Sequence, residues 1–192
     1  MRRRAALLAF ASVALAGAAA AALAVREPPG LSPGPLACEE CAVLALGFPV
    51  DPRRQFTYGL LLLRNEGGEP AVLDAVAPLE LTPGMRVAGA YVVRTEDNPW
   101  NVTADDHEHF PPPNIADVVR PLRGYAVAPA RRKTDTVEVI LGLEVARAGT
   151  YGFRGLAVDY HVGETAYRAT FQHRLRVCAP ARLHEGDCNA PS

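Results

Sequence analysis

The chain has 192 residues, 49% of them hydrophobic, and is rich in proline (17) and glycine (16). Its 20 lysine and arginine residues nearly balance 21 aspartate and glutamate residues, which leaves a formal net charge of -1. A charge so close to zero gives no general attraction to a polyanion, so we expect no nucleic-acid partner.

The N-terminal segment predicts export. Arginines at positions 2–4 precede an uncharged, alanine-rich apolar run at residues 5–25. We interpret residues 1–25 as a signal peptide, with an Ala-Leu-Ala cleavage site at 22–24, or as an N-terminal membrane anchor, an apolar helix that is held in the membrane through residues 5–25 if it is uncleaved. In both cases the basic start stays in the cytoplasm, and the remainder is secreted, periplasmic or anchored outside.

A proline- and glycine-rich stretch follows at residues 26–37 and is predicted to be an extended linker. Residues 38–188 form the expected folded part, whose length of about 150 residues suits one domain. Residues 189–192 are a short tail.

Four cysteines flank the predicted fold and fit an oxidising compartment. Cys38 and Cys41 form a C-x-x-C pair before the first strand, and Cys178 and Cys188 follow the last one. We favour local pairs, since the chain of a sandwich usually enters at one end and leaves at the other. Three pairings remain possible, and a four-cysteine zinc site is an open alternative. A redox-active C-x-x-C is not favoured, because an apolar strand-like run follows it instead of a helix N-terminus.

The folded part reads as short β-runs between turn residues. The first five expected strands are residues 42–47, 55–65, 70–76, 85–94 and 135–145. In the second, alternation predicts a shared face for Phe56, Tyr58, Leu60 and Leu62. In the fifth, it points five aliphatic residues inward and Thr136, Glu138 and Glu144 outward.

The last two runs are predicted to form a hairpin around Gly163-Glu164, a two-residue turn with glycine first. The resulting register pairs Val162 with Thr165, Tyr160 with Tyr167, Val158 with Ala169, and Leu156 with Phe171. Tyr151 and Phe153 have the opposite parity, so one extra residue near Arg154-Gly155, a bulge, is expected to bring both back inside.

The pattern of residues 42–178 resembles the immunoglobulin-like superfamily, and within it bacterial cell-envelope domains, through the motifs "LRNEGGEP" and "AGTYGF". The resemblance implies an all-β, antiparallel immunoglobulin-like β-sandwich of about seven strands with one long inter-strand loop. It also implies a structural corner, with the Tyr151 hydroxyl bonded to upstream backbone and Phe153 filling the space of the disulfide that antibody domains have. Architecture by resemblance carries no function.

The long loop, residues 95–134, is the expected contact region for a partner, with Trp100 and Phe110 as apolar anchors. It also holds Asp105, His107 and His109, which alternate and would project to one side of an extended segment. Two imidazoles and a carboxylate are competent ligands for zinc or copper(II). The competing interpretation is a solvated acidic loop without a ligand.

The last strand adds two features. His173 lies on the same face of this strand as its alternating apolar residues, and we predict that it is packed and hydrogen-bonded. Arg168, Arg174 and Arg176, with Arg154 nearby, lie on the outer face, either as solvated strand residues or as a patch for anionic lipid or wall polymer.

The sequence carries no G-x-S-x-G, H-E-x-x-H or phosphate-binding glycine loop, so catalysis is not expected. The predicted function is a non-catalytic extracytoplasmic binding or structural module of the bacterial cell envelope, without a cofactor. Its partner would be an envelope protein or an anionic lipid or wall polymer. The alternative is a periplasmic or secreted metal-binding protein that uses Asp105, His107 and His109.

Overall fold

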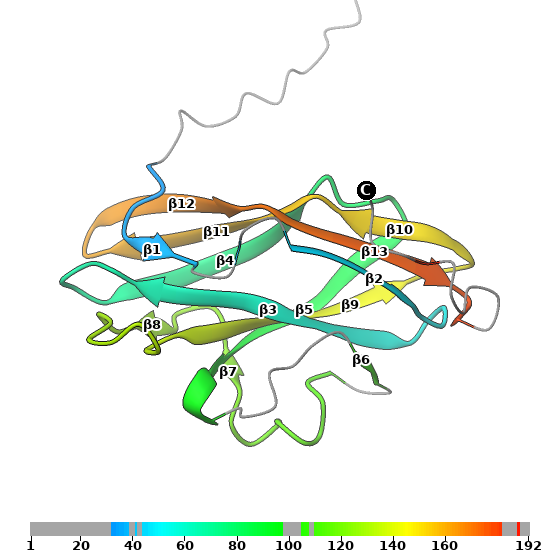
Figure 1. Ribbon diagram of the computed structural model, residues 1–192, viewed down its shortest axis with the longest axis horizontal. Helices are drawn as coiled ribbons and strands as arrows, with labels where there is room; N and C mark the ends of the chain where they lie inside the picture. Colours follow the sequence, from blue (N-terminus) through cyan, green and yellow to red (C-terminus); the bar gives the residue numbers. More distant parts are fainter. Residues whose placement is uncertain are drawn as a thin grey trace, which may run out of the picture.

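The computed structural model describes residues 32–38, 41, 44–97, 105–107, 110–181 and 188 (Figure 1). In this part of the chain no helix is long and apolar enough to cross a membrane. The predicted signal peptide or anchor at 1–25 and the tail at 189–192 lie outside it.

The described residues form an all-β structure with antiparallel sheets and a single short 3-10 turn, η1 (Thr95–Asp97). The strands are β1 (Leu36–Ala37), β2 (Leu44–Pro49), β3 (Gln55–Asn65), β4 (Ala71–Leu79), β5 (Met85–Arg94), β6 (Asp105–His107), β7 (Arg120–Pro121), β8 (Ala126–Val127), β9 (Val137–Val145), β10 (Gly149–Phe153), β11 (Gly155–Val162), β12 (Thr165–Phe171) and β13 (His173–Ala179).

The strands lie in two facing layers (Figure 1). One layer is a sheet in the order β1-β3-β9-β5-β7, with β6 added beside β3. The other contains the sheets β12-β11-β4-β8 and β10-β13-β2, in which β2 runs parallel to β13. The main hydrophobic core draws residues from both layers, among them Leu61, Leu141, Val158 and Val177, all fully buried.

The face assignment within β3 differs from the alternation that the sequence predicts. Leu60 has a positive φ of 75°, and the pairing of β3 with β9 shifts between Tyr58 and Leu61. After this irregularity Leu61 and Leu63 face the core, whereas Leu60 and Leu62 are only half-buried. The predicted shared face of Phe56, Tyr58, Leu60 and Leu62 is therefore wrong beyond Tyr58, because a β-bulge exchanges the two faces.

Glu138 explains how this bulge is tolerated. Its side chain is fully buried, and Oε1 accepts a hydrogen bond from the backbone N–H of Leu60 at 3.2 Å. The carboxylate thus receives an N–H at the point where the ladder between β3 and β9 is interrupted. Glu138 points away from the main core, as alternation predicts, but it is fully buried and not exposed to solvent.

The hairpin of β11 and β12 has the four predicted pairs, from Val162 with Thr165 to Leu156 with Phe171. Tyr151 and Phe153 are also buried, as expected. The register shifts where predicted, but the extra residue lies in the opposite strand. Phe153 and Leu156 are three positions apart in the chain, whereas their partners Leu175 and Phe171 are four positions apart.

The described part of the long loop covers the outer face of the β5–β9 pair. Two hydrogen-bonded turns, with Ile115 N–H bonded to Pro112 and Val119 N–H bonded to Ile115, place both apolar side chains in a second small core with Val93 and Ile140. Phe110 joins this cluster. The loop therefore adds a partial third layer beneath the sheet.

The described end of the predicted linker contacts the fold. Tyr160 Oη donates a hydrogen bond to the Pro33 carbonyl at 2.5 Å and accepts one from the Leu36 N–H at 3.1 Å. A Cβ on Gly34 would lie 2.3 Å from this hydroxyl and 2.5 Å from the Tyr167 ring, so only glycine fits so close an approach.

Candidate functional site

Both cysteine pairs form disulfides, Cys38 with Cys41 and Cys178 with Cys188. These are the local pairs that the sequence favours, and they indicate an oxidising, extracytoplasmic environment. The pairs lie near opposite ends of β13, because Cys41 contacts its first residue, His173, and Cys178 is its sixth. These residues are about 16 Å apart along an extended strand, so the four cysteines do not form one zinc site.

A polar cluster links the Cys38–Cys41 disulfide to the interior. His173, fully buried, places Nε2 2.8 Å from the Cys41 Sγ and Nδ1 2.7 Å from the Tyr58 hydroxyl. Tyr58 belongs to β3 in the facing layer and is also fully buried. The contact therefore joins the two layers through the core.

The protonation of this cluster follows from its bonding. A disulfide sulfur carries no hydrogen, so Nε2–H donates to Cys41 and Nδ1 accepts the proton of the Tyr58 hydroxyl. Burial lowers the pKa of His173 to about 4 and raises the pKa of Tyr58 above its usual value. The imidazole is therefore neutral and the phenol protonated near neutral pH.

The sequence identifies His173 as a packed, hydrogen-bonded residue, but it gives neither partner. Tyr58 lies 115 positions from His173, and Cys41 lies 132 positions away. The available signals were the inward parity of the histidine and the C-x-x-C before the strand that pairs with β13. Nothing in the spacing says that the two meet, since the parallel β2–β13 pairing that brings them together is long-range.

Tyr151 and Phe153 occupy the predicted corner. The Tyr151 hydroxyl donates to the Arg147 carbonyl, four residues upstream, at 3.0 Å. Phe153 is buried in the core, and its ring meets Tyr58 edge to face with centroids 5.2 Å apart. Phe153 therefore packs against the tyrosine that contacts His173.

A second feature lies on the outer face of the β10–β13 pair. Arg154, Arg174 and Arg176 line a hollow of about 430 Å³ together with Thr82, Thr150 and Glu80. Arg154 lies 3.9 Å from Glu80, both largely exposed. Arg174 and Arg176 are half-buried and have no acidic partner among the described residues. The hollow therefore combines three positive charges with one negative charge.

Small residues flank the two central arginines of this hollow. Arg176 stands opposite Gly152 on one side and Gly47 on the other, and Arg174 stands opposite Ala45. A ligand that approaches these two guanidinium groups therefore passes over glycine and alanine and meets no bulky side chain from the neighbouring strands. Arg168, which the sequence groups with them, instead makes a bidentate ion pair with Asp159 at 2.5 and 2.8 Å.

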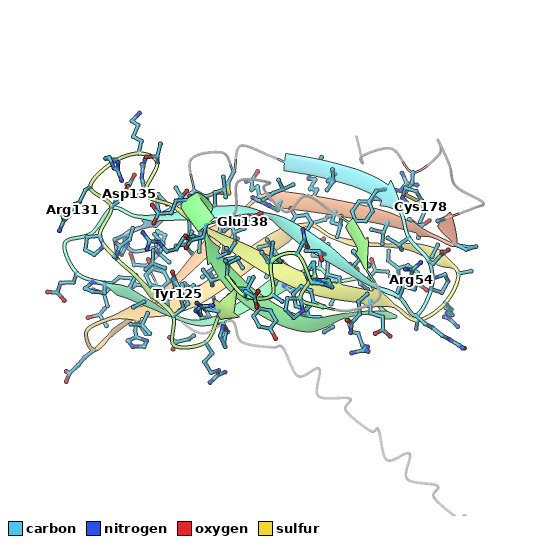
Figure 2. All side chains as sticks on the ribbon, turned by 90° about the horizontal axis from the view of Figure 1, so that it is seen from below. Arg54, Tyr125, Arg131, Asp135, Glu138 and Cys178 are labelled. Atoms are coloured by element: carbon cyan, nitrogen blue, oxygen red, sulfur yellow. A yellow bond between two sulfur atoms is a disulfide. The ribbon has the colours of Figure 1, made fainter. Side chains whose placement is uncertain are left out.

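A larger hollow of about 730 Å³ is lined by both ends of the long loop and the strand residues beside them. Arg94, Arg131 and Arg132 line it, but Arg94 pairs with Glu96 and Arg132 with Asp135. Figure 2 shows Arg131, Asp135 and Tyr125 toward the end of the molecule opposite Cys178. The charges that line this larger hollow are mostly paired with one another, unlike those that line the smaller hollow.

The structure describes only part of the loop residues that the sequence predicts as a metal or partner site. The backbone of residues 105–107 forms β6, antiparallel to β3, so Asp105 and His107 lie in an extended segment. Their side chains, together with His109 and Trp100, lie outside the described residues. The metal site and the Trp100 anchor therefore stay predictions.

Phe110 is described, and its ring is engaged within the fold. The ring meets Tyr91 at a centroid distance of 5.3 Å, and a Cβ on Gly142 would lie 2.4 Å from it. Phe110 therefore attaches the long loop to the sheet, which leaves only the exposed part of its ring for a partner.

No protein-family model and no curated protein matches the chain. Five solved chains are similar in structure, among them VesB protease from Vibrio cholerae (10% identity, TM-score 0.33) and the CooA pilin subunit from enterotoxigenic Escherichia coli (9% identity, TM-score 0.34). The match covers 76% of this chain and 32% of the protease, and 78% of this chain and 98% of the pilin. Likeness at this level carries no conclusion about activity.

Proposed function

We propose that this protein is a non-catalytic, extracytoplasmic binding module of the bacterial cell envelope that recognises phosphate-bearing anionic groups through Arg154, Arg174 and Arg176. The observation that carries the proposal is the pair of half-buried arginines, Arg174 and Arg176, with no acidic partner among the described residues. A half-buried guanidinium without an acidic partner is stabilised when an external anion binds to it. Phosphate suits this role, because two of its oxygens can accept parallel N–H hydrogen bonds from the planar guanidinium group.

Two further features support the proposal. The two disulfides fit a chain exported by the basic and apolar N-terminal segment and folded outside the cytoplasm. The two layers and the Tyr151 corner fit an immunoglobulin-like sandwich, an architecture that presents binding surfaces on a rigid frame. The ligand is an anionic lipid headgroup or an anionic wall polymer, which share phosphate chemistry.

The test measures binding of the purified protein to vesicles with anionic phospholipid and, separately, to a phosphate-rich wall polymer. Vesicles of neutral lipid serve as the blank. We expect binding to one of the two anionic probes, weakened by added salt. Since each basic residue near an anionic surface contributes about 1 kcal/mol, the Arg174→Ala/Arg176→Ala variant should bind roughly 30-fold more weakly.

The matched control is Arg131→Ala/Lys133→Ala, which removes two exposed positive charges from the loop segment that lines the larger hollow and not the arginine hollow. It should bind as the unchanged protein does. Equal weakening of both variants would mean diffuse charge attraction instead of a site, and indifference to both anionic probes would end the proposal. Binding to vesicles alone identifies a lipid ligand, and binding to the polymer alone identifies a wall ligand.

A further inference from the structure

The Cys38–Cys41 disulfide and His173 place three metal-ligating atoms together. The two Sγ atoms and an imidazole nitrogen all lie within 4.8 Å of one another. None of the sites predicted from the sequence includes His173, and the four-cysteine zinc alternative shares only Cys38 and Cys41 with this group. The group lies apart from the arginine hollow, because His173 points inward whereas Arg174 and Arg176 point outward.

We propose that reduction of the Cys38–Cys41 disulfide converts this group into a Zn²⁺ site with three protein ligands, the two cysteine thiolates and Nε2 of His173. The reductant is a dithiol, small or protein-borne. Two electrons and two protons pass to the cysteine sulfurs, the S–S bond breaks, and the dithiol becomes a disulfide. On binding Zn²⁺ each thiol then releases its proton to solvent.

The geometry fits zinc because the donor set and its spacing are those of zinc sites. A C-x-x-C pair supplies two sulfurs at once, and Zn–S and Zn–N bonds of about 2.3 and 2.0 Å place tetrahedral ligand atoms roughly 3.5 Å apart. The present separations reach that value after small side-chain rotations, which breaking of the S–S bond permits. The fourth position, open in this set, would hold water or a group from a ligand.

Tyr58 orients the histidine for this role. In the oxidised protein Nε2–H donates to Cys41 and Nδ1 accepts from the tyrosine. A metal on Nε2 requires the hydrogen on Nδ1 instead, and the Tyr58 oxygen, 2.7 Å away, then accepts it. A hydroxyl can serve in both directions, so it holds the ring in place in each state, as the outer partners of zinc-bound histidines do.

The two cysteines are also partly exposed. Cys38 and Cys41 are half-buried, whereas His173 is fully buried behind them. A reductant and an ion therefore approach from the sulfur side, and the imidazole forms the floor of the site. In the oxidised state the sulfurs are bonded to each other, so the site is open to zinc only after reduction.

The test uses the full chain with Cys178→Ala/Cys188→Ala, so that only the Cys38–Cys41 thiols can contribute. The protein is reduced with a phosphine under anaerobic conditions and titrated with Zn²⁺ against a chromophoric chelator. We expect one Zn²⁺ per chain after reduction and none at this site before it. Cys38→Ser and His173→Gln should each abolish tight binding, and Tyr58→Phe should weaken it roughly 10–100-fold.

The His107→Gln/His109→Gln variant separates this site from the predicted loop site and should bind Zn²⁺ unchanged. A second measurement does not depend on variants that fail to fold: zinc-edge X-ray absorption of the reduced protein should show two sulfur ligands and at least one nitrogen ligand. Lack of stoichiometric binding after reduction would overturn the proposal. So would binding that survives His173→Gln, or a spectrum without nitrogen.

Discussion

The sharpest quantitative consequence of the Tyr58–His173–Cys41 contact is a loss of stability in mild acid. The pKa of His173 is lowered by burial from 6.5 to about 4 in the folded chain. In the unfolded chain the imidazole takes up a proton near pH 6.5, so between the two values the unfolded state binds more protons. Stability is therefore full above pH 6.5 and falls as the pH drops towards 4.

The magnitude follows from the width of that window. Each pKa unit corresponds to 1.36 kcal/mol, so a shift of this size costs about 3 kcal/mol when the pH is lowered from 7 to 4. Neither hydrogen-bond partner offsets this, because the Tyr58 phenol is protonated and the disulfide carries no charge. A loss of about 3 kcal/mol is a large share of the stability of a typical domain.

The assay is urea unfolding at a series of pH values from 4 to 7, followed by tryptophan fluorescence or circular dichroism. His173→Gln is the reference, since it keeps a hydrogen-bonding side chain but does not titrate. All other acids and bases contribute equally to both proteins, so the difference between their stability profiles isolates His173. Parallel profiles across this range would refute the reasoning, whatever the absolute stability of the variant.

Three further predictions concern the frame around the sites. Gly152→Ala places a Cβ 2.0 Å from the Leu175 carbonyl oxygen, a backbone atom that cannot move freely, and should cost at least about 3 kcal/mol in urea unfolding. Gly68→Ala, with no atom within 4 Å, is its neutral control, and equal effects would contradict the close approach. Tyr151→Phe removes the bond to Arg147 and should lower stability by about 1 kcal/mol, whereas an unchanged midpoint would deny the corner a stabilising role. Removing the Cys178–Cys188 disulfide by Cys178→Ala/Cys188→Ala should cost about 3 kcal/mol of loop entropy, visible as a lower Tm, and an unaltered Tm would show that this bridge does not stabilise the fold.

The sequence predicts strands wherever local patterning dominates. The bounds of β3 and β5 match the expected runs, and the register of the β11–β12 hairpin follows from its glycine turn. The errors arise where a long-range partner changes local geometry. The alternation of β3 fails at a β-bulge, where the N–H of Leu60 is bonded by the side chain of Glu138 from β9.

The same difference between local patterning and long-range contacts separates the parts of the candidate sites that the sequence predicts from those that it does not. Alternation alone predicts that Arg168, Arg174 and Arg176 face outward with Arg154 nearby, and three of these four arginines line one hollow. Arg168 leaves that group because Asp159 pairs with it across the β11–β12 ladder, a contact set by register. The sulfur–histidine group depends on a parallel pairing between strands at opposite ends of the chain, for which the sequence holds no local signal.

The arrangement of β13 makes the two proposals independently testable. Its side chains alternate, so His173 faces the core and the Cys38–Cys41 pair, whereas Arg174 and Arg176 face outward over small residues. Alanine at the arginines leaves the inward face untouched, and glutamine at His173 leaves the outer hollow its charges. A mutual effect, such as altered anion binding on reduction of Cys38–Cys41, would require movement of the strand itself, because no side chain belongs to both groups.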